Sequence, residues 1–119
     1  MKAWQASEAE TQRAIIEYLK IKENKGELLW FRMNAGTAFV GSEAKGRYPV
    51  RLQRPGTADL LVIDYERYGT QVYNVVIWIE VKSPTGKLSA DQQAFKERVE
   101  ALGCTYIVAR SVDDVMEVI

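Results

Sequence analysis

The sequence contains no histidine and a single cysteine, Cys104, among its 119 residues. These scarcities exclude an internal disulfide, the usual zinc sites, and catalytic centres built on Ser-His or Cys-His pairs. Any metal must therefore be held by oxygen ligands, which favours Mg²⁺, Mn²⁺ or Ca²⁺. A lone cysteine also fits a reducing cytosol.

Long apolar runs and a net charge are also missing. No run approaches the ~20 apolar residues needed to cross a bilayer. The first ten residues show no apolar signal core, so we expect a cytoplasmic protein without a membrane partner. Sixteen basic residues balance sixteen acidic ones, so any polyanion must be bound by a local charge cluster. The hydrophobic share of 47% predicts one globular domain spanning residues 1–119.

Apolar periodicity, caps and turn residues predict the element order α-β-β-β-α-β-α. The expected elements are helix 7–23, strand 28–33, strand 59–63, strand 72–82, helix 89–102, strand 104–109 and a short helix after Ser111. We place the hairpin turn between the second and third strands at 65–71. Apolar residues on both faces of 72–82 mark a central strand. The expected fold is therefore α/β, a mixed sheet flanked by helices.

Residues 34–57 are predicted to form a long irregular loop, because glycine and proline recur along them. A loop of this length in a small domain usually serves a function. Between Ala44 and Ala58 it carries four basic residues and no acid. These are Lys45, Arg47, Arg51 and Arg54.

The triplet Glu80-Val81-Lys82 is the most informative segment. Because side chains alternate along a strand, Glu80 and Lys82 point to one face, which they share with Trp78. An ionised pair at the end of a buried strand is costly unless a metal ion or solvent compensates it. A structural salt bridge explains the pair equally well.

Asp59 strengthens the metal interpretation. If strands 59–63 and 72–82 pair antiparallel, Asp59 lies beside Glu80 and Lys82. Two adjacent carboxylates repel each other unless they share a proton or a cation. A divalent site completed by a strand carbonyl and waters meets that need. The alternative for Asp59 is a turn or cap residue, which is common after Pro-Gly.

Both long helices supply further polar candidates. Glu8 extends the apolar stripe of the first helix toward its start, where it can reach a metal directly or through water. A first-turn acid favoured by the helix dipole is the simpler explanation for Glu8, and a capping box with Ser7 explains Glu10. In the second helix, Gln92 either completes a capping box or contacts Lys82 or a phosphate.

In this order, the residues resemble the PD-(D/E)xK nuclease superfamily, and within it the virus-type replication-repair nuclease (VRR-Nuc) domain of small phage and bacterial proteins. The resemblance covers nearly the whole chain. Its segments are 7–12, 32–36, 56–60, 79–83, 86–89, Gln92 and 103–106. Glu80-x-Lys82 alone is a weak signal, whereas the ordered set is specific. Where the family often has proline before its aspartate, this chain has Ala58, a small residue that is tolerated there.

The resemblance implies a restriction-endonuclease-like αβββαβ core that hydrolyses DNA phosphodiester bonds with a metal. Asp59, Glu80 and the Val81 carbonyl would hold Mg²⁺ or Mn²⁺, joined by Glu8, directly or through water, or otherwise by Glu10. No organic cofactor is implied.

Roles for the remaining candidates follow from the same resemblance. Lys82 would orient the attacking water or stabilise charge in the transition state. Gln92 would help to hold Lys82 and the phosphate. Five basic residues would grip the DNA backbone. They are Lys45, Arg47, Arg51, Arg54 and Lys87.

A symmetric homodimer is implied as well, acting on branched DNA such as four-way Holliday junctions in a bacterial or phage-infected cell. Two symmetric cuts need two active sites, which a two-fold dimer supplies. Aromatic residues beyond the needs of one small core give loose support, although most are expected in the core or at its rim. They are Trp4, Trp30, Phe31, Tyr65, Tyr68 and Tyr73. The alternatives are a general or restriction-like nuclease and a non-catalytic DNA-binding module, which the intact Asp59, Glu80 and Lys82 disfavour.

Overall fold

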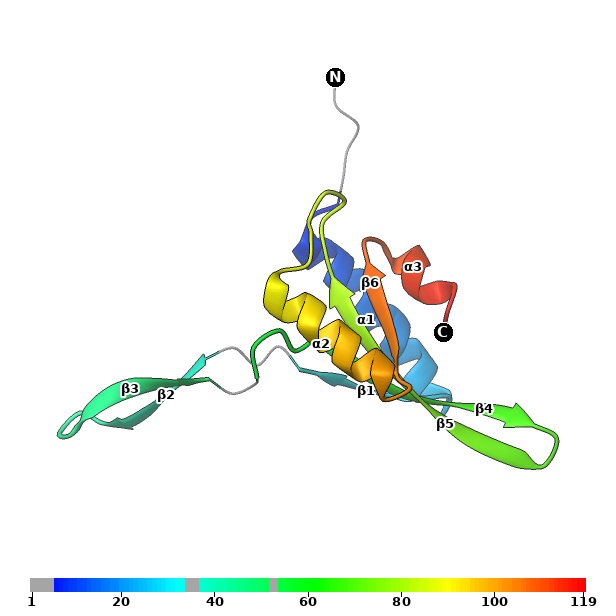
Figure 1. Ribbon diagram of the computed structural model, residues 1–119, viewed down its shortest axis with the longest axis horizontal. Coiled ribbons are helices and arrows are strands. Elements are labelled where there is room, and N and C mark those ends of the chain that lie inside the picture. The colour runs from blue at the N-terminus through cyan, green and yellow to red at the C-terminus, as the bar shows by residue number, and fades with distance from the viewer. Residues whose placement is uncertain (1–5, 34–36, 52–53) are drawn as a thin grey trace, which may run out of the picture.

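The chain is built on a four-stranded mixed sheet with helices on both faces (Figure 1). The computed structural model describes residues 6–33, 37–51 and 54–119. The elements are α1 (Glu8–Asn24), β1 (Leu29–Arg32), β2 (Thr37–Ser42), β3 (Gly46–Arg51), β4 (Leu60–Tyr68), β5 (Gln71–Val81), α2 (Ala90–Ala101), β6 (Thr105–Ala109) and α3 (Val112–Met116). The strand order is β1-β4-β5-β6. The first three strands pair antiparallel, and β6 runs parallel to β5. The predicted α/β class is confirmed.

Two apolar clusters hold the helices to the sheet. On one face, Ile15 and Leu19 of α1 pack with Leu60 and Ile79, all with no exposed surface. On the other face, Phe95 and Val99 of α2 pack with Ala58. The Phe95 ring meets that of Trp78 edge-on, with centroids 5.0 Å apart. β5 is thus covered on both faces, as the apolar pattern predicted.

The caps of the two long helices differ. In α2 the capping box is complete, because Gln92 N–H donates to Ser89 Oγ at 3.1 Å and Ser89 N–H donates to Gln92 Oε1 at 2.9 Å. At α1, Glu10 N–H donates to Ser7 Oγ at 3.1 Å. The Glu10 carboxylate accepts from the Ser7 hydroxyl at 3.0 Å, so the predicted box forms only in part.

The long irregular loop predicted for 34–57 is wrong over most of its length. Residues 37–51 form an antiparallel hairpin of β2 and β3, with Pro49 opposite Phe39. Proline is tolerated there because both strands of a two-stranded sheet have a free edge. Two of the glycines that suggested a loop, Gly41 and Gly46, serve the hairpin instead. A Cβ on Gly41 would lie 2.3 Å from the carbonyl oxygen of Gly46.

The second hairpin is longer than expected. β4 continues to Tyr68, which pairs with Gln71 of β5, so the turn is confined to the Gly69 region rather than 65–71. Both hairpins project from the packed layers (Figure 1). The radius of gyration is 16.9 Å, against about 13.5 Å expected for a compact domain of this length.

Candidate active site

The predicted meeting of Asp59 with Glu80 is present at one end of the sheet. Leu60 pairs with Ile79 across β4 and β5, so Asp59, immediately before β4, falls beside Glu80. The backbone N–H of Asp59 donates to Glu80 Oε2 at 3.2 Å. Asp59 Oδ2 in turn accepts from the N–H of Val81 at 2.8 Å. These two reciprocal bonds fix both carboxylates against the strand ends.

The turn before Asp59 is held against α2. Both the N–H and the hydroxyl of Thr57 donate to the carbonyl of Arg54, at 3.2 Å and 2.8 Å. Gly56 has φ +81, and a Cβ on it would lie 2.1 Å from the carbonyl oxygen of Asp91. Only glycine combines this positive φ with such a close approach to the first turn of a helix. Pro55-Gly56 is therefore a structural requirement for placing Asp59.

Electrostatically, this sheet end is short of positive charge. Glu80 is 3% exposed, and burial followed by the negative charge of Asp59 raises its pKa to about 7. Burial is also the main cause that raises the pKa of Asp59. One ammonium group, that of Lys82, lies 3.9 Å from Glu80 Oε1. Two carboxylates facing a single ammonium form a set of hard oxygen donors that a divalent cation would stabilise.

A complete carboxylate cage is not preformed. Across residues 6–33, 37–51 and 54–119, no three Asp, Glu, His or Cys side chains are gathered closely enough to hold a metal ion. The Asp59–Glu80 pair fits a divalent cation as a partial ligand set, which backbone carbonyls and waters commonly complete.

Gln92 forms the capping box that the sequence predicted and also reaches the site, through a partner that the sequence did not indicate. Its Oε1 completes the capping box of α2. Its Nε2 donates to Glu80 Oε1 at 2.8 Å, so its side-chain partner is Glu80 rather than the expected Lys82. One side chain thereby ties the start of α2 to the buried carboxylate.

The two first-turn acids of α1 are placed differently. Glu8 is exposed, yet its negative charge raises the pKa of both Asp59 and Glu80, so it lies close to the pair. Glu10 accepts from the Ser7 hydroxyl and thus has a cap partner. The placement favours Glu8 over Glu10 as the first-helix candidate.

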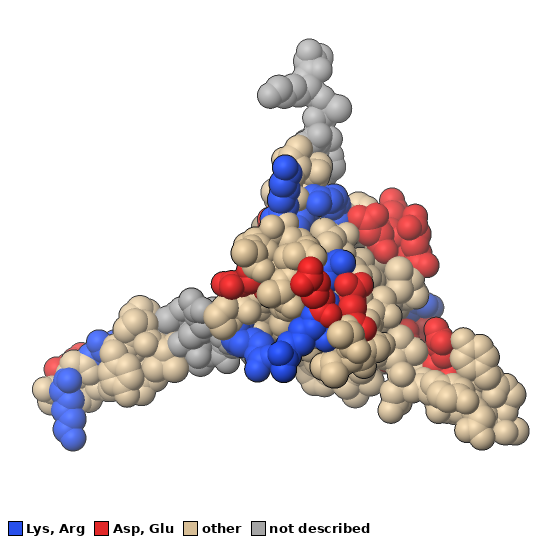
Figure 2. All heavy atoms as spheres, viewed as in Figure 1, with Lys and Arg blue, Asp and Glu red and all other residues tan. Residues whose placement is uncertain are grey.

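Most of the predicted DNA-contacting residues are exposed. Lys45 lies in the β2–β3 turn, Arg47 lies on β3, and Arg51 is the last residue of that strand. Figure 2 shows basic side chains toward the outer end of this hairpin. Arg54 and Lys87 are exposed near the sheet end. The backbone N–H of Met33 donates to the carbonyl of Asp59 at 2.7 Å, so the hairpin departs from the chain beside the carboxylate pair.

Two residues near this end were given no role from the sequence, although Tyr106 lies in the segment 103–106 of the resemblance. The Arg110 guanidinium donates to the carbonyls of Ser83 and Gly86, both at 2.7 Å, and so fixes the turn that follows Lys82. The Tyr106 hydroxyl is buried with no hydrogen-bond partner among the described residues. Burial and then the charge of Glu80 raise its pKa. The contacts of neither residue follow from the sequence, because both depend on how β6 aligns with β5.

A carboxylate leading into one strand and a Glu-x-Lys triplet ending its antiparallel neighbour define the PD-(D/E)xK type of nuclease, which hydrolyses DNA and generally needs divalent metal ions. The VRR-NUC domain model matches residues 6–113. The chain therefore belongs to the VRR-NUC family, as its sequence pattern suggested. Neither the curated proteins nor the solved structures gave a match. Among the described residues, no helix has the length and apolar character to span a membrane.

Proposed function

We propose that this chain is a metal-dependent endonuclease for branched DNA, a Holliday junction resolvase that acts as a homodimer of one nuclease domain. The observation that carries the proposal is the pair of buried Glu80 and half-buried Asp59 with Lys82 beside it. A structural ion pair would need only one carboxylate. A second, half-buried carboxylate of raised pKa, that of Asp59, costs stability, and a cation-binding role explains why it is kept.

Asp59 and Glu80, together with the carbonyl of Val81, are the residues that would hold Mg²⁺ or Mn²⁺. Glu8 would contribute directly or through water. Such an ion supplies polarisation of the scissile phosphate and a lowered pKa for an attacking water. The Val81 N–H bond to Asp59 and the Asp59 N–H bond to Glu80 orient both carboxylates before any ligand arrives.

Lys82 and Gln92 complete the centre. The Lys82 ammonium, held near Glu80, would orient the attacking water or stabilise negative charge that develops on the phosphate. Gln92 would act as a positioning residue, because its amide holds Glu80 Oε1. Its role differs from the phosphate contact that the sequence suggested.

DNA contact is assigned to the basic residues of the hairpin and of the loops around this centre. Lys45 and Arg47 on the hairpin, with Arg51, Arg54 and Lys87, offer charge without a shape that reads bases. Contacts of this kind position a duplex and carry little sequence information. They fit an enzyme that recognises the structure of DNA.

A homodimer is supported by the β4–β5 hairpin. Tyr65, Tyr68 and Tyr73, expected in the core or at its rim, are 46%, 63% and 52% exposed. Trp30, in contrast, packs against the core, and Trp4 lies outside the described residues. An apolar surface on a projecting hairpin is one that a second copy can cover. Sedimentation of the purified protein at micromolar concentration measures its oligomeric state directly.

The deciding experiment is cleavage of a labelled four-way junction and a matched linear duplex, with Mg²⁺ or Mn²⁺. We expect paired symmetric nicks in the junction, little cutting of the duplex, and none with Lys82→Ala. Equal cutting of both substrates would replace the resolvase with a general or restriction-like nuclease. DNA binding without cutting of any substrate would favour the non-catalytic module.

A further inference from the structure

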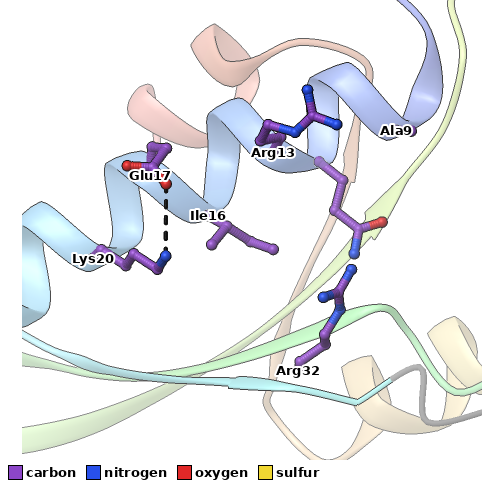
Figure 3. Close-up of a pocket in the computed structure, with 7 residues that line it drawn as sticks. Ala9, Arg13, Ile16, Glu17, Lys20 and Arg32 are labelled. Atoms are coloured by element: carbon purple, nitrogen blue, oxygen red, sulfur yellow. Dashed lines mark ion pairs between the residues drawn. The ribbon is translucent and has the colours of Figure 1, made fainter.

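A basic pocket lies between α1 and β1, on the face of the sheet opposite α2 (Figure 3). It has a volume of about 320 Å³, room for a phosphate group and several waters, because one water occupies about 30 Å³. Six of its lining residues matter here: Gln12, Arg13, Ile16, Glu17, Lys20 and Arg32. None of the residues singled out for catalysis or DNA contact belongs to it.

The charge of this pocket is only partly compensated. Glu17 is the one acid in its lining, and it pairs with Lys20 at 3.6 Å (Figure 3). Within the described part of the chain, Arg13 and Arg32 form no ion pair. Two guanidinium groups therefore line one cavity without a carboxylate partner of their own among the described residues. Guanidinium forks match the oxygens of a phosphate.

Gln12 adds an unmet hydrogen-bond requirement. Its amide nitrogen is buried and has no acceptor among the described residues. A buried donor without a partner costs free energy that an incoming acceptor would recover. The pocket thus combines two unpaired cations with one unpaired donor. Its lining contains no aromatic side chain on which a base could stack.

The position of the pocket connects it to the candidate active site. Gln12 lies one helical turn after Glu8, or about 6 Å along the helix axis. The charge of Glu8 raises the pKa of Asp59 and of Glu80. Arg32 pairs with Leu60, the residue after Asp59. Phosphates follow one another every ~3.4 Å of axis along a DNA strand. A strand cut beside Asp59 can therefore place a nearby phosphate in the pocket.

We propose that this pocket binds a backbone phosphate of the DNA a few nucleotides from the scissile bond, held by Arg13, Arg32 and the amide of Gln12. This inference rests on the proposed nuclease function, and it adds a contact that fixes the register of the strand. Recognition there is of a phosphate, not of a base.

The first test measures DNA binding against salt concentration in the Lys82→Ala background, where DNA stays intact. Arg32→Gln should lower affinity about tenfold for all sequences and reduce the slope of log K against log salt by about 0.9. Lys25→Gln, an exposed substitution at the other end of α1, is the matched control and should leave the slope unchanged. Arg32→Lys should keep the slope. Thermal unfolding of each variant verifies that it folds.

The second test locates the phosphate. Single neutral methylphosphonates are scanned along the strand. One position should weaken binding of the parent protein and have no further effect in Arg32→Gln, because the same contact is already lost. Additive effects at every position would overturn the proposal. So would an unchanged salt slope in Arg32→Gln while the parent protein binds DNA normally.

A free phosphate is the competing source of the same chemistry. If inorganic phosphate raised the melting temperature of the parent protein but not of Arg32→Gln, with equal salt slopes for DNA, the pocket would serve a small anion and the DNA proposal would fall. Failure of the wild-type protein to bind or cut DNA would instead overturn the nuclease function itself.

Discussion

The sheet end around Asp59 and the β2–β3 hairpin are neighbours, because the hairpin begins shortly after Met33, which bonds to Asp59. The two regions are built in opposite ways. At the sheet end, Glu80 is 3% exposed, and hydrogen bonds of 2.8 to 3.2 Å hold both carboxylates in place. On the hairpin, Phe39 is 71% exposed, and Lys45 and Arg47 lie in solvent. The contrast suggests a division of work. Groups that take part in bond cleavage need fixed geometry, whereas groups that hold a polyanion need only charge and reach.

The largest expected effect tests the catalytic side of this comparison, the carboxylate pair at the sheet end. Glu80→Gln removes one charge from the carboxylate pair and should lower the single-turnover cleavage rate at least about a hundredfold. The double variant Lys45→Gln/Arg47→Gln, with two charges removed from the hairpin, is the matched control. It should cut at a similar rate once DNA is saturating. Normal cutting by Glu80→Gln would show that the site is assigned to the wrong residues.

Two glycines, one in each region, allow the same comparison to be made through the free energy of unfolding. Gly56 and Gly46 have nearly equal positive φ values, +81 and +82, but a Cβ on Gly46 meets nothing within 4 Å. Gly46→Ala should cost about 1 kcal/mol for its backbone conformation. Gly56→Ala adds a clash with the Asp91 carbonyl and should cost about 2–4 kcal/mol. Urea unfolding measures both variants, and equal costs would refute the close packing of the Asp59 turn on α2.

The pH dependence of stability tests the Asp59–Glu80 carboxylate pair without any substrate. With Glu80 titrating near 7 in the fold, the metal-free folded state binds more protons than the unfolded state between about pH 4.5 and 7. Its free energy of unfolding should therefore fall as pH rises through that range and level off above it. The loss is a few kcal/mol at most, because one pKa unit corresponds to about 1.4 kcal/mol. Asp59 acts in the same direction.

Unfolding by urea in EDTA at several pH values measures this slope. Glu80→Gln should flatten it, since the titrating group is gone. Added Mg²⁺ at pH 8 should restore the lost stability by binding the folded state only. A slope that persists undiminished in Glu80→Gln would mean that other groups cause it.

Much of the fold could be predicted because its signals are local. Periodicity and caps located α1, α2 and the central strand, and the antiparallel pairing of 59–63 with 72–82 brought Asp59 to Glu80. The β2–β3 hairpin was missed because its glycines and Pro49 are the residues that usually mark loops. These residues fit a hairpin only because β2 and β3 pair with each other, and a local pattern does not show that pairing.

The contacts that complete the site lie beyond local reasoning. Gln92 meets Glu80 rather than Lys82 because α2 is docked by Gly56 and Phe95, a packing arrangement with no spacing signal. Arg110 reaches the turn at Ser83 only because β6 lies parallel to β5. Sequence patterns thus identified Asp59, Glu80, Lys82 and Gln92 but not the contacts that orient them.

The smallest expected effect concerns the hairpin alone. Lys45→Gln/Arg47→Gln should weaken DNA binding several-fold at low salt and lower the slope of log K against log salt by up to about 2, one for each lost phosphate contact. The effect should shrink at high salt, because exposed charges are screened beyond about 10 Å at 0.1 M. Lys96→Gln is the matched control, since Lys96 already pairs with Glu100 at 3.0 Å. If the hairpin variant binds and cuts like the wild type at every salt concentration, Lys45 and Arg47 do not contact the substrate. DNA contact would then fall to Arg54, Lys87 and the pocket between α1 and β1.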